Sequence, residues 1–293
     1  MVEMSHAQKP IKVAPGRGFV KEKFHPRAGA LALVVLLAAG GTPAGVRAQE
    51  EGFDTSPYAR VLEKYITPTG EVRYAELKAN PADLNAFVRQ LAAVSPENRP
   101  ELFPTPAAQK AYWINAYNAF VLHAVLRAYP VGSVRDMKFG FGLFFFKRAW
   151  FVAGSKRYSL DDIEHGILRK QFADPRVHFA VNCASLSCPS IRREPYRAEQ
   201  LEQQLEEAAR EFIGNEDNVW MRGDVLFLSK IFDWYGEDFL KALERDGVQR
   251  PSLADYVVRY LPEPAAARVR QERPRIEFYG YNWSLNDASA RAD

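Results

Sequence analysis

The stretch TPAAQKAYWINAYNAFVLHAVLRAYP, residues 105–130, decides the fold that we expect for this chain. Thr105 followed by proline is typical of a helix start, and Pro130 should end the helix because proline cannot continue it. Apolar residues occupy most of the helix circumference, which indicates burial on nearly every side. We therefore predict a central helix around which the rest of the chain packs.

Three polar residues, Tyr112, Asn115 and Asn118, recur at intervals of three within this helix and therefore share one face. Burying such groups unpaired costs about 1–3 kcal/mol each, so each must form hydrogen bonds. Two interpretations stay open. The three residues hold neighbouring loop backbone, or Asn115 or Asn118 lines a binding site and orients a catalytic partner or a substrate amide. His123 lies among apolar residues and is more typical of a core histidine than of a ligand.

Helical and extended patterns alternate on both sides of the central helix. Helices are expected over residues 56–66, 80–94, 160–172, 198–214, 230–243, 252–261 and 263–271. The helix over 198–214 is expected to stop at a left-handed Gly214. Hairpins are expected over 148–160 and 218–229, buried strands over 176–182 and 275–287, and a strand or turn over 70–77. This order predicts an α+β fold: a helix-rich single domain with a small, largely antiparallel sheet.

The N-terminal residues have the layout of a secretory signal: a basic segment, an apolar run over 28–40, and small residues before position 49. The apolar run is shorter than the roughly 20 residues that span a bilayer, so an uncleaved anchor is the less favoured alternative. We expect a signal peptide over 1–48, a flexible lead-in over 49–57, one domain over 58–286 and a flexible tail over 287–293. The protein should be periplasmic or secreted, with membrane contact only through an uncleaved signal.

Net charge argues against a nucleic-acid partner. Without the seven basic and two acidic residues of the leader, the chain has 32 basic and 34 acidic residues, and it lacks the clustered positive surplus typical of nucleic-acid binders. The sequence contains no phosphate-binding glycine loop, dinucleotide fingerprint or H-E-x-x-H helix. No cofactor is therefore expected.

The two cysteines of the chain, Cys183 and Cys188, lie in HFAVNCASLSCPS, residues 178–190. In an oxidising compartment they can form a disulfide, although the short loop between them would give only a small stabilisation. A metal site with His123, His165 or His178 is disfavoured, because four intervening residues lie at the edge of the usual zinc spacing. No metal is expected. A redox-active pair is also disfavoured, because the spacing is not C-x-x-C.

The remaining possibility is that Cys183 is a nucleophile with His165 as its base. Asp161, four residues before His165 on a helix, is placed to fix the tautomer of the imidazole. Glu164 is expected to point elsewhere, toward an arginine or lysine. The alternative for this segment is a capped surface helix with ordinary charges, begun by Ser159 and Asp162.

The residues around Cys183 are candidates for binding. If 178–183 form a strand, His178 and Cys183 point to opposite faces, so His178 is expected to be a hydrogen-bonded strand histidine that reaches Cys183 only if the chain folds back at Asn182. The small residues after Cys183, Ser185 among them, would leave backbone amides free to hold an oxyanion. His178, Asn182 and Ser185 are therefore predicted binding residues.

Four segments together resemble one protein family, domain of unknown function 547: AYWINAYNAFVLHAVL, YSLDDIEHGIL, HFAVNCASLSCPSI and LSKIFDWYGEDF. The resemblance extends from about Tyr58 to Asn286 and implies a family but no reaction. A histidine that precedes the cysteine also resembles the order in circularly permuted papain-like hydrolases, a distant analogy that must be judged by geometry.

Two functional hypotheses follow. The first is a cysteine-dependent hydrolase or transferase that acts on an amide or thioester of an unknown small molecule or peptide. The second is a non-enzymatic envelope module with a Cys183–Cys188 disulfide, which binds an envelope protein through an aromatic surface. The stretch FGFGLFFFKRAW, residues 139–150, would supply that surface as an apolar lid or patch, or else form a strand packed on both faces.

Overall fold

The computed structural model of this protein describes residues 53–137 and 144–291. The predicted signal peptide (1–48), the first four residues of the lead-in and the first part of the phenylalanine-rich stretch lie outside the described residues. The predicted central helix is confirmed as α4 (Pro106–Ala128), in which most side chains are buried. Thr105 caps it as expected, because its hydroxyl accepts a hydrogen bond from the backbone N–H of Ala108 at 3.1 Å.

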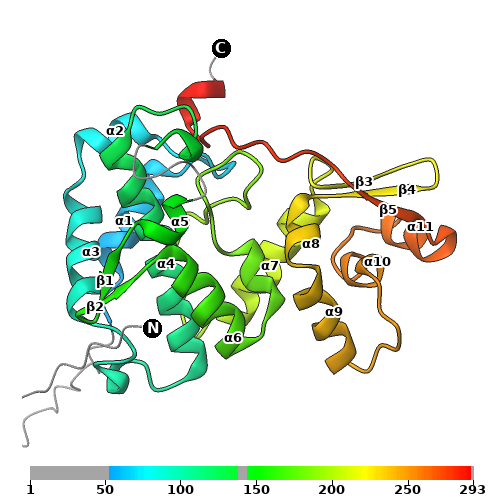
Figure 1. The fold of residues 1–293 in the computed structure, drawn as a ribbon, viewed down its shortest axis with the longest axis horizontal. Coiled ribbons are helices and arrows are strands. Elements are labelled where there is room, and N and C mark those ends of the chain that lie inside the picture. The colour runs from blue at the N-terminus through cyan, green and yellow to red at the C-terminus, as the bar shows by residue number, and fades with distance from the viewer. Residues whose placement is uncertain (1–52, 138–143, 292–293) are drawn as a thin grey trace, which may run out of the picture. The chain divides into compact units, whose positions relative to one another are not determined.

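Three helices precede α4 and pack with it: α1 (Ser56–Tyr65), α2 (Tyr74–Ala79) and α3 (Ala82–Ala93). Figure 1 shows α1 and α3 alongside α4. Tyr58 of α1 stacks on Phe87 of α3 at a ring separation of 4.7 Å. The short turn η1 (Pro100–Leu102) lies between α3 and α4, and two more short helical segments, η2 (Val134–Asp136) and α5 (Phe144–Arg148), follow α4. The segment 70–77, predicted as a strand or turn, forms two isolated bridges at Val72, to Ile66 and to Asp287, and is otherwise largely the helix α2.

The first predicted hairpin is confirmed as β1 (Phe151–Ala153) and β2 (Lys156–Tyr158). Its turn packs on the end of α3, where Leu91 and Ala92 accept hydrogen bonds from the backbone of Gly154 and Ser155. Gly154 has φ +56°, and a Cβ at this position would lie 2.1 Å from the Ser95 hydroxyl. Only glycine fits here without a shift of the α3 terminus.

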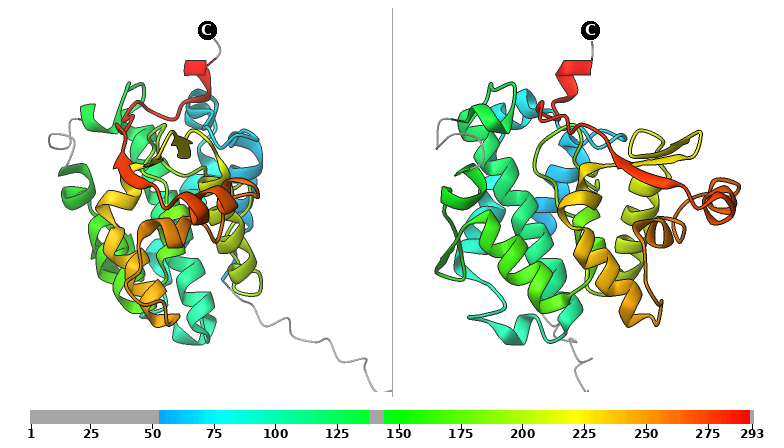
Figure 2. Two further views of the ribbon diagram at one scale, coloured as in Figure 1. Left: turned by 90° about the vertical axis from the view of Figure 1, so that its right-hand side faces the viewer. Right: turned by 45° about the vertical axis from the view of Figure 1, so that its right-hand side comes forward.

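The next helix begins with the predicted capping box. The Asp162 backbone N–H donates a hydrogen bond to the Ser159 hydroxyl at 3.0 Å, and the Ser159 backbone N–H donates one to the Asp162 carboxylate at 2.8 Å. Residues Asp162–Leu168 wind as a π-helix, η3, which continues into α6 (Arg169–Phe172). π-Helical turns are rare and frequent at functional sites. Figure 2 shows this helical segment beside α4, with which it has many contacts.

The strand predicted over 176–182 is wrong: this segment forms the 3-10 helix η4 (Pro175–Phe179) followed by a turn. The Asp174 carboxylate accepts from the backbone N–H of Arg176 at 3.1 Å and so caps the segment. Val181 then donates back to the carbonyl of Val177. A proline and an acidic cap at the start favour helical winding locally, and this outweighs the strand preference of the β-branched and aromatic residues that follow.

The C-terminal part contains helix α7 (Leu201–Gly214) and a three-stranded sheet of β3 (Val219–Arg222), β4 (Val225–Leu228) and β5 (Arg275–Phe278). The second hairpin is confirmed, with Gly223 in the left-handed region at φ +61°. The strand predicted over 275–287 is shorter than expected: only β5 joins the sheet, and it lies parallel to β4. Gly214 is the last helical residue and is not among the residues with positive φ, so its predicted left-handed stop is wrong.

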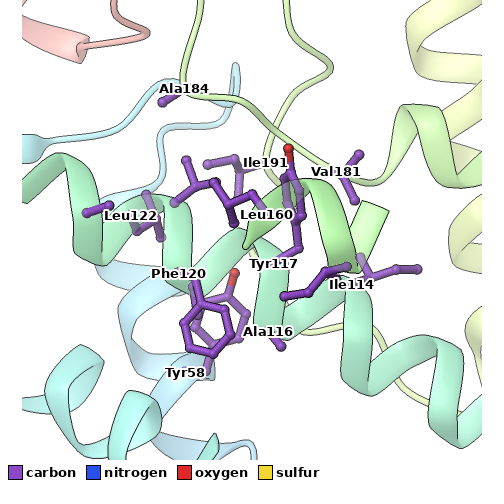
Figure 3. Packing of buried hydrophobic residues seen from close by; sticks show 14 of the residues in the cluster. Tyr58, Ile114, Ala116, Tyr117, Phe120, Leu122, Leu160, Val181, Ala184 and Ile191 are labelled. Atoms are coloured by element: carbon purple, nitrogen blue, oxygen red, sulfur yellow. The ribbon is translucent and has the colours of Figure 1, made fainter. Parts of the chain in front are cut away.

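The predicted helix over 230–243 is broken at Tyr235 into α8 (Lys230–Trp234) and α9 (Gly236–Arg245). Helices α10 (Leu253–Val257) and α11 (Ala265–Glu272) follow, and they pack with α7, α9 and the sheet around a second apolar cluster. The first cluster surrounds α4, and Figure 3 shows Tyr117 of α4 in it beside residues of three later segments, Leu160, Val181 and Ile191.

The fold class is confirmed as a helix-rich α+β single domain with small sheets. The ordered domain extends beyond its predicted boundaries at both ends. The lead-in ends before Ser56, where α1 begins. Asp287, expected in a flexible tail, is buried and accepts a hydrogen bond from the Tyr129 hydroxyl at 2.8 Å, and a 3-10 turn, η5 (Ala288–Arg291), follows it. None of the described helices has the length and apolar character needed to cross a membrane.

Candidate functional site

A pocket of about 340 Å³ brings both cysteines together with most of the predicted catalytic residues. Its wall is formed by α4, the helical segment η3, the loop that contains the cysteines, helix α8 and the residues after β5. Cys183, His165, Asp161 and His178 all line it. The sequence placed Asp161 and His165 on one helix and His178 and Cys183 on the following segment, and the fold assembles all four around one cavity.

Cys183 and Cys188 form a disulfide with an S–S distance of 2.03 Å, as the second hypothesis requires. The backbone N–H of Cys183 also donates a hydrogen bond to the Cys188 sulfur at 2.9 Å, which closes a tight loop. Both cysteines are partly exposed and line the pocket. In this oxidised form neither sulfur is a thiolate, so neither is available as a nucleophile or as a thiolate ligand of a metal.

Two hydroxyl groups contact the disulfide from the protein side. The Ser185 hydroxyl lies 3.1 Å from the Cys183 sulfur, and the Tyr281 hydroxyl lies 3.2 Å from the same sulfur and 3.1 Å from that of Cys188. A disulfide sulfur has no hydrogen, so the hydroxyls must be the donors. Burial raises the pKa of Tyr281 well above its usual value, which keeps this donor protonated.

Tyr281 reaches the cysteines because the final segment of the chain pairs with their loop. Ser185 and Leu285 form a bridge, and the backbone N–H groups of Leu186 and Ser187 donate to the carbonyls of Ser284 and Asn282. A segment nearly one hundred residues away in sequence therefore completes the pocket. No local pattern in the sequence signals this pairing.

Glu164 points into the protein and not toward an arginine or lysine, which corrects the prediction made for it. Its carboxylate accepts hydrogen bonds from the hydroxyls of Tyr117 at 3.0 Å and Tyr235 at 2.6 Å. The residue is 8 % exposed and lines the pocket. Burial and the charge of Glu164 raise the pKa values of both tyrosines well above their usual value, so both remain donors.

His165, the predicted base, has its lone pair engaged. Arg169 donates to the Nδ1 atom of His165 at 2.8 Å, and an arginine can only donate. The neutral imidazole must therefore carry its hydrogen on Nε2, which lies 3.7 Å from the Asp161 carboxylate. Asp161 is thus beside His165 as predicted. However, the ring would have to lose its bond to Arg169 before it could accept a proton at Nδ1.

His178 has the opposite arrangement. It is 2 % exposed, and its Nε2 atom lies 2.8 Å from the carboxylate of Asp238, which also accepts two hydrogen bonds from Arg169. Its Nδ1 atom has no hydrogen-bond partner among the described residues. The ring stacks on Tyr235 at 3.9 Å. Burial lowers the pKa of His178, and the Asp238 carboxylate offsets this only in part, so the ring is neutral with a free lone pair on Nδ1.

The three predicted binding residues of α4 form hydrogen bonds with backbone groups of neighbouring segments. The amide of Asn115 binds the backbone N–H and carbonyl of Tyr196, and the amide of Asn118 bridges the Ala180 carbonyl and the Asn182 N–H. The Tyr112 hydroxyl donates to the Val94 carbonyl at 2.7 Å. These three are not among the residues that line the pocket.

Asn182 organises the cysteine loop from inside. Its side chain accepts from the Ala184 N–H at 2.7 Å and donates to the Pro189 carbonyl at 2.7 Å. It therefore spans the loop next to the disulfide. Ser185 contacts the disulfide directly but does not line the pocket.

Three aromatic side chains that sequence reasoning did not single out form part of the pocket wall: Trp234, Tyr281 and Trp283. Their ring centroids lie 4.6–5.7 Å apart at tilted angles, and Trp234 is 45 % exposed. The signal for Trp234 and Tyr235 was present in the FDWYGEDF segment, where two large aromatic residues precede a glycine. The described residues contain no group of three or more histidine, cysteine or acidic side chains arranged to hold a metal ion.

Residues 103–213 match the model of one protein family, whose description is "Protein of unknown function, DUF547". The match covers α4, the helical segment η3 and the cysteine loop, and it confirms the resemblance found in the sequence over that range. No curated protein and no solved structure matches the chain.

Proposed function

We propose that the protein is an exported binding module that holds a small organic ligand in the pocket beside the Cys183–Cys188 disulfide. The family model that matches residues 103–213 describes no function, so the proposal rests on the site itself. The observation that carries this proposal is the disulfide in the pocket wall. It fixes the loop and removes the thiolate that an enzyme of the first hypothesis would need.

The composition of the pocket supports binding of a small ligand. Its volume of about 340 Å³ is at the lower end of the range for small-molecule sites, which is about 300–1,000 Å³. Six phenylalanine, tyrosine and tryptophan side chains line it, and a few polar groups converge on it, Glu164 among them. Such a combination of apolar surface with few fixed polar groups is typical of ligand sites.

Export is supported by the sequence of the leader and by the disulfide, because disulfides persist in oxidising compartments. We infer a periplasmic or secreted protein on these two grounds. In such a compartment the pocket would meet small molecules or peptides outside the cytoplasm.

The proposal is tested by a thermal-shift screen of small neutral and charged compounds against the oxidised domain. At least one compound should raise the melting temperature, because a ligand that binds only the folded state stabilises it. The same compound should lose its effect on Trp234→Ala and keep it on Trp150→Ala. Both tryptophans are exposed, but Trp150 does not line the pocket. If every stabilising compound acts equally on both variants, ligands do not bind in this pocket.

A second candidate is the cysteine-dependent hydrolase or transferase, which the free Nδ1 of His178 favours. After a dithiol reductant opens the disulfide, the Cys183 thiol would attack the carbonyl carbon of an amide or thioester. The imidazole would take the thiol proton and return it to the leaving amine or thiol. A thiol-directed probe distinguishes the bases: His178→Ala or His165→Ala should slow labelling of Cys183 in the reduced protein. Equal labelling of both variants and the parent protein would remove this candidate.

A further inference from the structure

We propose that the ligand of this pocket is a free organic cation with an alkylated ammonium group. This inference rests on the proposed binding function and names its ligand class. It follows from an unpaired buried carboxylate and a group of aromatic rings in the same pocket wall, neither of which the disulfide explains.

The negative charge comes from Glu164. The carboxylate accepts two tyrosine hydrogen bonds, and among the described residues no lysine or arginine lies within ion-pair distance of it. Its charge helps to raise the pKa of Arg169, but Arg169 forms its ion pair with Asp238. A buried charge without an opposite charge is costly, and a bound cation would supply the missing partner. Asp161 adds a second carboxylate to the wall, 34 % exposed and 3.7 Å from the His165 ring.

The aromatic rings supply the surface that such a cation prefers. Trp234, Tyr281 and Trp283 lie within 5.7 Å of one another by ring centroid, and Tyr235 is nearby on the wall that holds Glu164. Aromatic faces attract cations, tryptophan most strongly, and groups of such rings recognise quaternary ammonium ligands. A carboxylate behind the rings adds a long-range attraction that neutral ligands do not feel.

Two arginines that do not line the pocket already lie over two of these rings. The Arg169 guanidinium lies 5.1 Å from the Tyr235 centroid, and that of Arg135 lies 5.7 Å from the Trp283 centroid. Arg169 is held by Asp238, so its charge is compensated outside the pocket. Lys147 also lines the pocket, but it is exposed and can extend into solvent.

The size of the pocket favours a free molecule with a compact head group. About 340 Å³ accommodates a trimethylammonium group with a short chain but few additional atoms. We therefore commit to a small-molecule cation as the occupant. A peptide that carries a lysine or trimethyl-lysine side chain presents the same chemistry and serves as a separate arm of the test.

The decisive comparison uses two probes of the same shape: choline and its neutral carbon isostere 3,3-dimethylbutan-1-ol. Calorimetric titration of the oxidised domain should show choline binding at least about tenfold more tightly, because cation–π attraction and the carboxylate act on the charge alone. Equal affinity for the two probes, or no binding of choline at millimolar concentration, overturns the proposal. Tighter binding of a trimethyl-lysine peptide than of choline overturns the choice of a free molecule.

Two variants locate the effect. Glu164→Gln removes the charge and keeps an acceptor oxygen for one of the two tyrosine hydroxyls, so choline affinity should fall about tenfold while the neutral isostere is unaffected. Glu244→Gln, an exposed residue outside this pocket, is the matched charge control.

Trp234→Ala should also lower the affinity for choline about tenfold, with Trp150→Ala as its control. Because Trp234 is 45 % exposed, its replacement tests the proposal even if the Glu164 variant unfolds.

The outcome separates this inference from the proposed function. If neutral or anionic compounds bind in a way that depends on Trp234 and choline does not, the pocket is a ligand site with the wrong charge preference, and only the cation proposal fails. If no compound of any charge binds in a way that depends on Trp234, both fail.

Discussion

The two histidines of the pocket differ in the nitrogen that keeps a free lone pair. Arg169 occupies the Nδ1 atom of His165, whereas Asp238 binds the Nε2 atom of His178 and leaves its Nδ1 without a partner among the described residues. Burial raises the cost of a charge on Asp238, but the hydrogen bonds from His178 and Arg169 outweigh it, and the pKa of Asp238 is well below its usual value. Asp238 therefore remains an anion that holds His178 in one tautomer.

This arrangement predicts a pH dependence of stability. Burial lowers the pKa of His178 from 6.5, so the unfolded chain binds a proton at a higher pH than the native protein does. The contribution of His178 is complete above pH 6.5 and is lost as the pH falls from that value toward the native pKa. The free energy of unfolding should fall by up to about 1.4 kcal/mol per pH unit in this range on account of His178.

Urea denaturation between pH 5 and pH 8 checks this prediction. His178→Gln keeps a donor for Asp238 but cannot titrate, so the slope below pH 6.5 should be smaller than in the parent protein. His123 has a pKa that is lowered by burial and titrates with the same sign, and therefore only the difference between the two proteins reports on His178. Identical slopes in both would contradict the lowered pKa of His178.

Asn118 is a buried polar residue of α4 whose side chain bridges two backbone groups. Its amide satisfies the Ala180 carbonyl and the Asn182 N–H, and both of these groups are buried. Asn118→Ala should lower the free energy of unfolding by about 2–4 kcal/mol, because it leaves two backbone groups unpaired. Asn85→Ala, at a half-buried position of α3, should change it by less than about 0.5 kcal/mol. Similar losses in the two variants would show that the bridge to 180–182 contributes little.

At the scale of elements, the cysteine loop is held from three sides. The disulfide closes it, Asn182 spans it from inside, and the segment after β5 pairs with it through Ser185 and Leu285. The fold therefore does not depend on the disulfide alone. This redundancy distinguishes a stapled loop in a large domain from the disulfide framework of a small secreted protein.

The double replacement Cys183→Ser, Cys188→Ser should lower the free energy of unfolding by about 2 kcal/mol, the loop-closure term for so short a loop, without loss of secondary structure. Urea denaturation and circular dichroism measure the two quantities. The parent protein in a dithiol reductant is the control and should have the same stability as the double variant. A global collapse of the fold on reduction would mean that the pairing with the C-terminal segment depends on the disulfide.

The helix that carries His165 and Glu164 depends on its first turn. Ser159 is buried and forms a reciprocal pair of hydrogen bonds with Asp162, from which the π-helical turns follow. Ser159→Ala should cost about 1 kcal/mol, and Ser252→Ala, at the equivalent but exposed capping box of α10, provides the comparison. Thermal denaturation measures both losses. No loss in the Ser159 variant would show that tertiary contacts alone fix the helix start.

At the scale of the whole molecule, two apolar clusters surround α4 and the C-terminal sheet, and the pocket has lining residues from both: Tyr117 and Val181 belong to the first cluster, and Ile231 to the second. A ligand that contacts both sides would stabilise the domain as a unit. The negative charge of the chain without its leader, 32 basic against 34 acidic residues, is compatible with attraction of a cation.

Export predicts a defined product. Expression of the full chain in a Gram-negative host should yield a soluble periplasmic protein that begins at Gln49, with an intact mass two hydrogens below that of the reduced chain. N-terminal sequencing and intact-mass measurement without reductant check the two parts. A leaderless variant that starts at Gln49, retained in the cytoplasm, is the control and should contain free thiols. Retention of residues 1–48 or free thiols in the exported protein would contradict the prediction.

The sequence by itself determined the buried central helix, both hairpins, the capping box at Ser159 and the α+β class, because each depends on local periodicity or on a cap within a few residues. It also brought Cys183, His165 and Asp161 forward as one site, and they do line one pocket.

Only the tertiary structure decided the chemistry of that site. Residues 176–182 form the 3-10 helix η4 and the turn after it instead of a strand, so His178 faces Asp238 and the pocket. Glu164 binds tyrosines in place of a basic residue. From the far end of the chain, Tyr281 reaches the disulfide and Trp283 reaches the pocket wall, through backbone pairing that no local pattern specifies. The free lone pair of His178, the carboxylate of Glu164 without an ion pair and the meeting of the aromatic rings all depend on contacts between distant segments. These contacts form only when the whole chain packs.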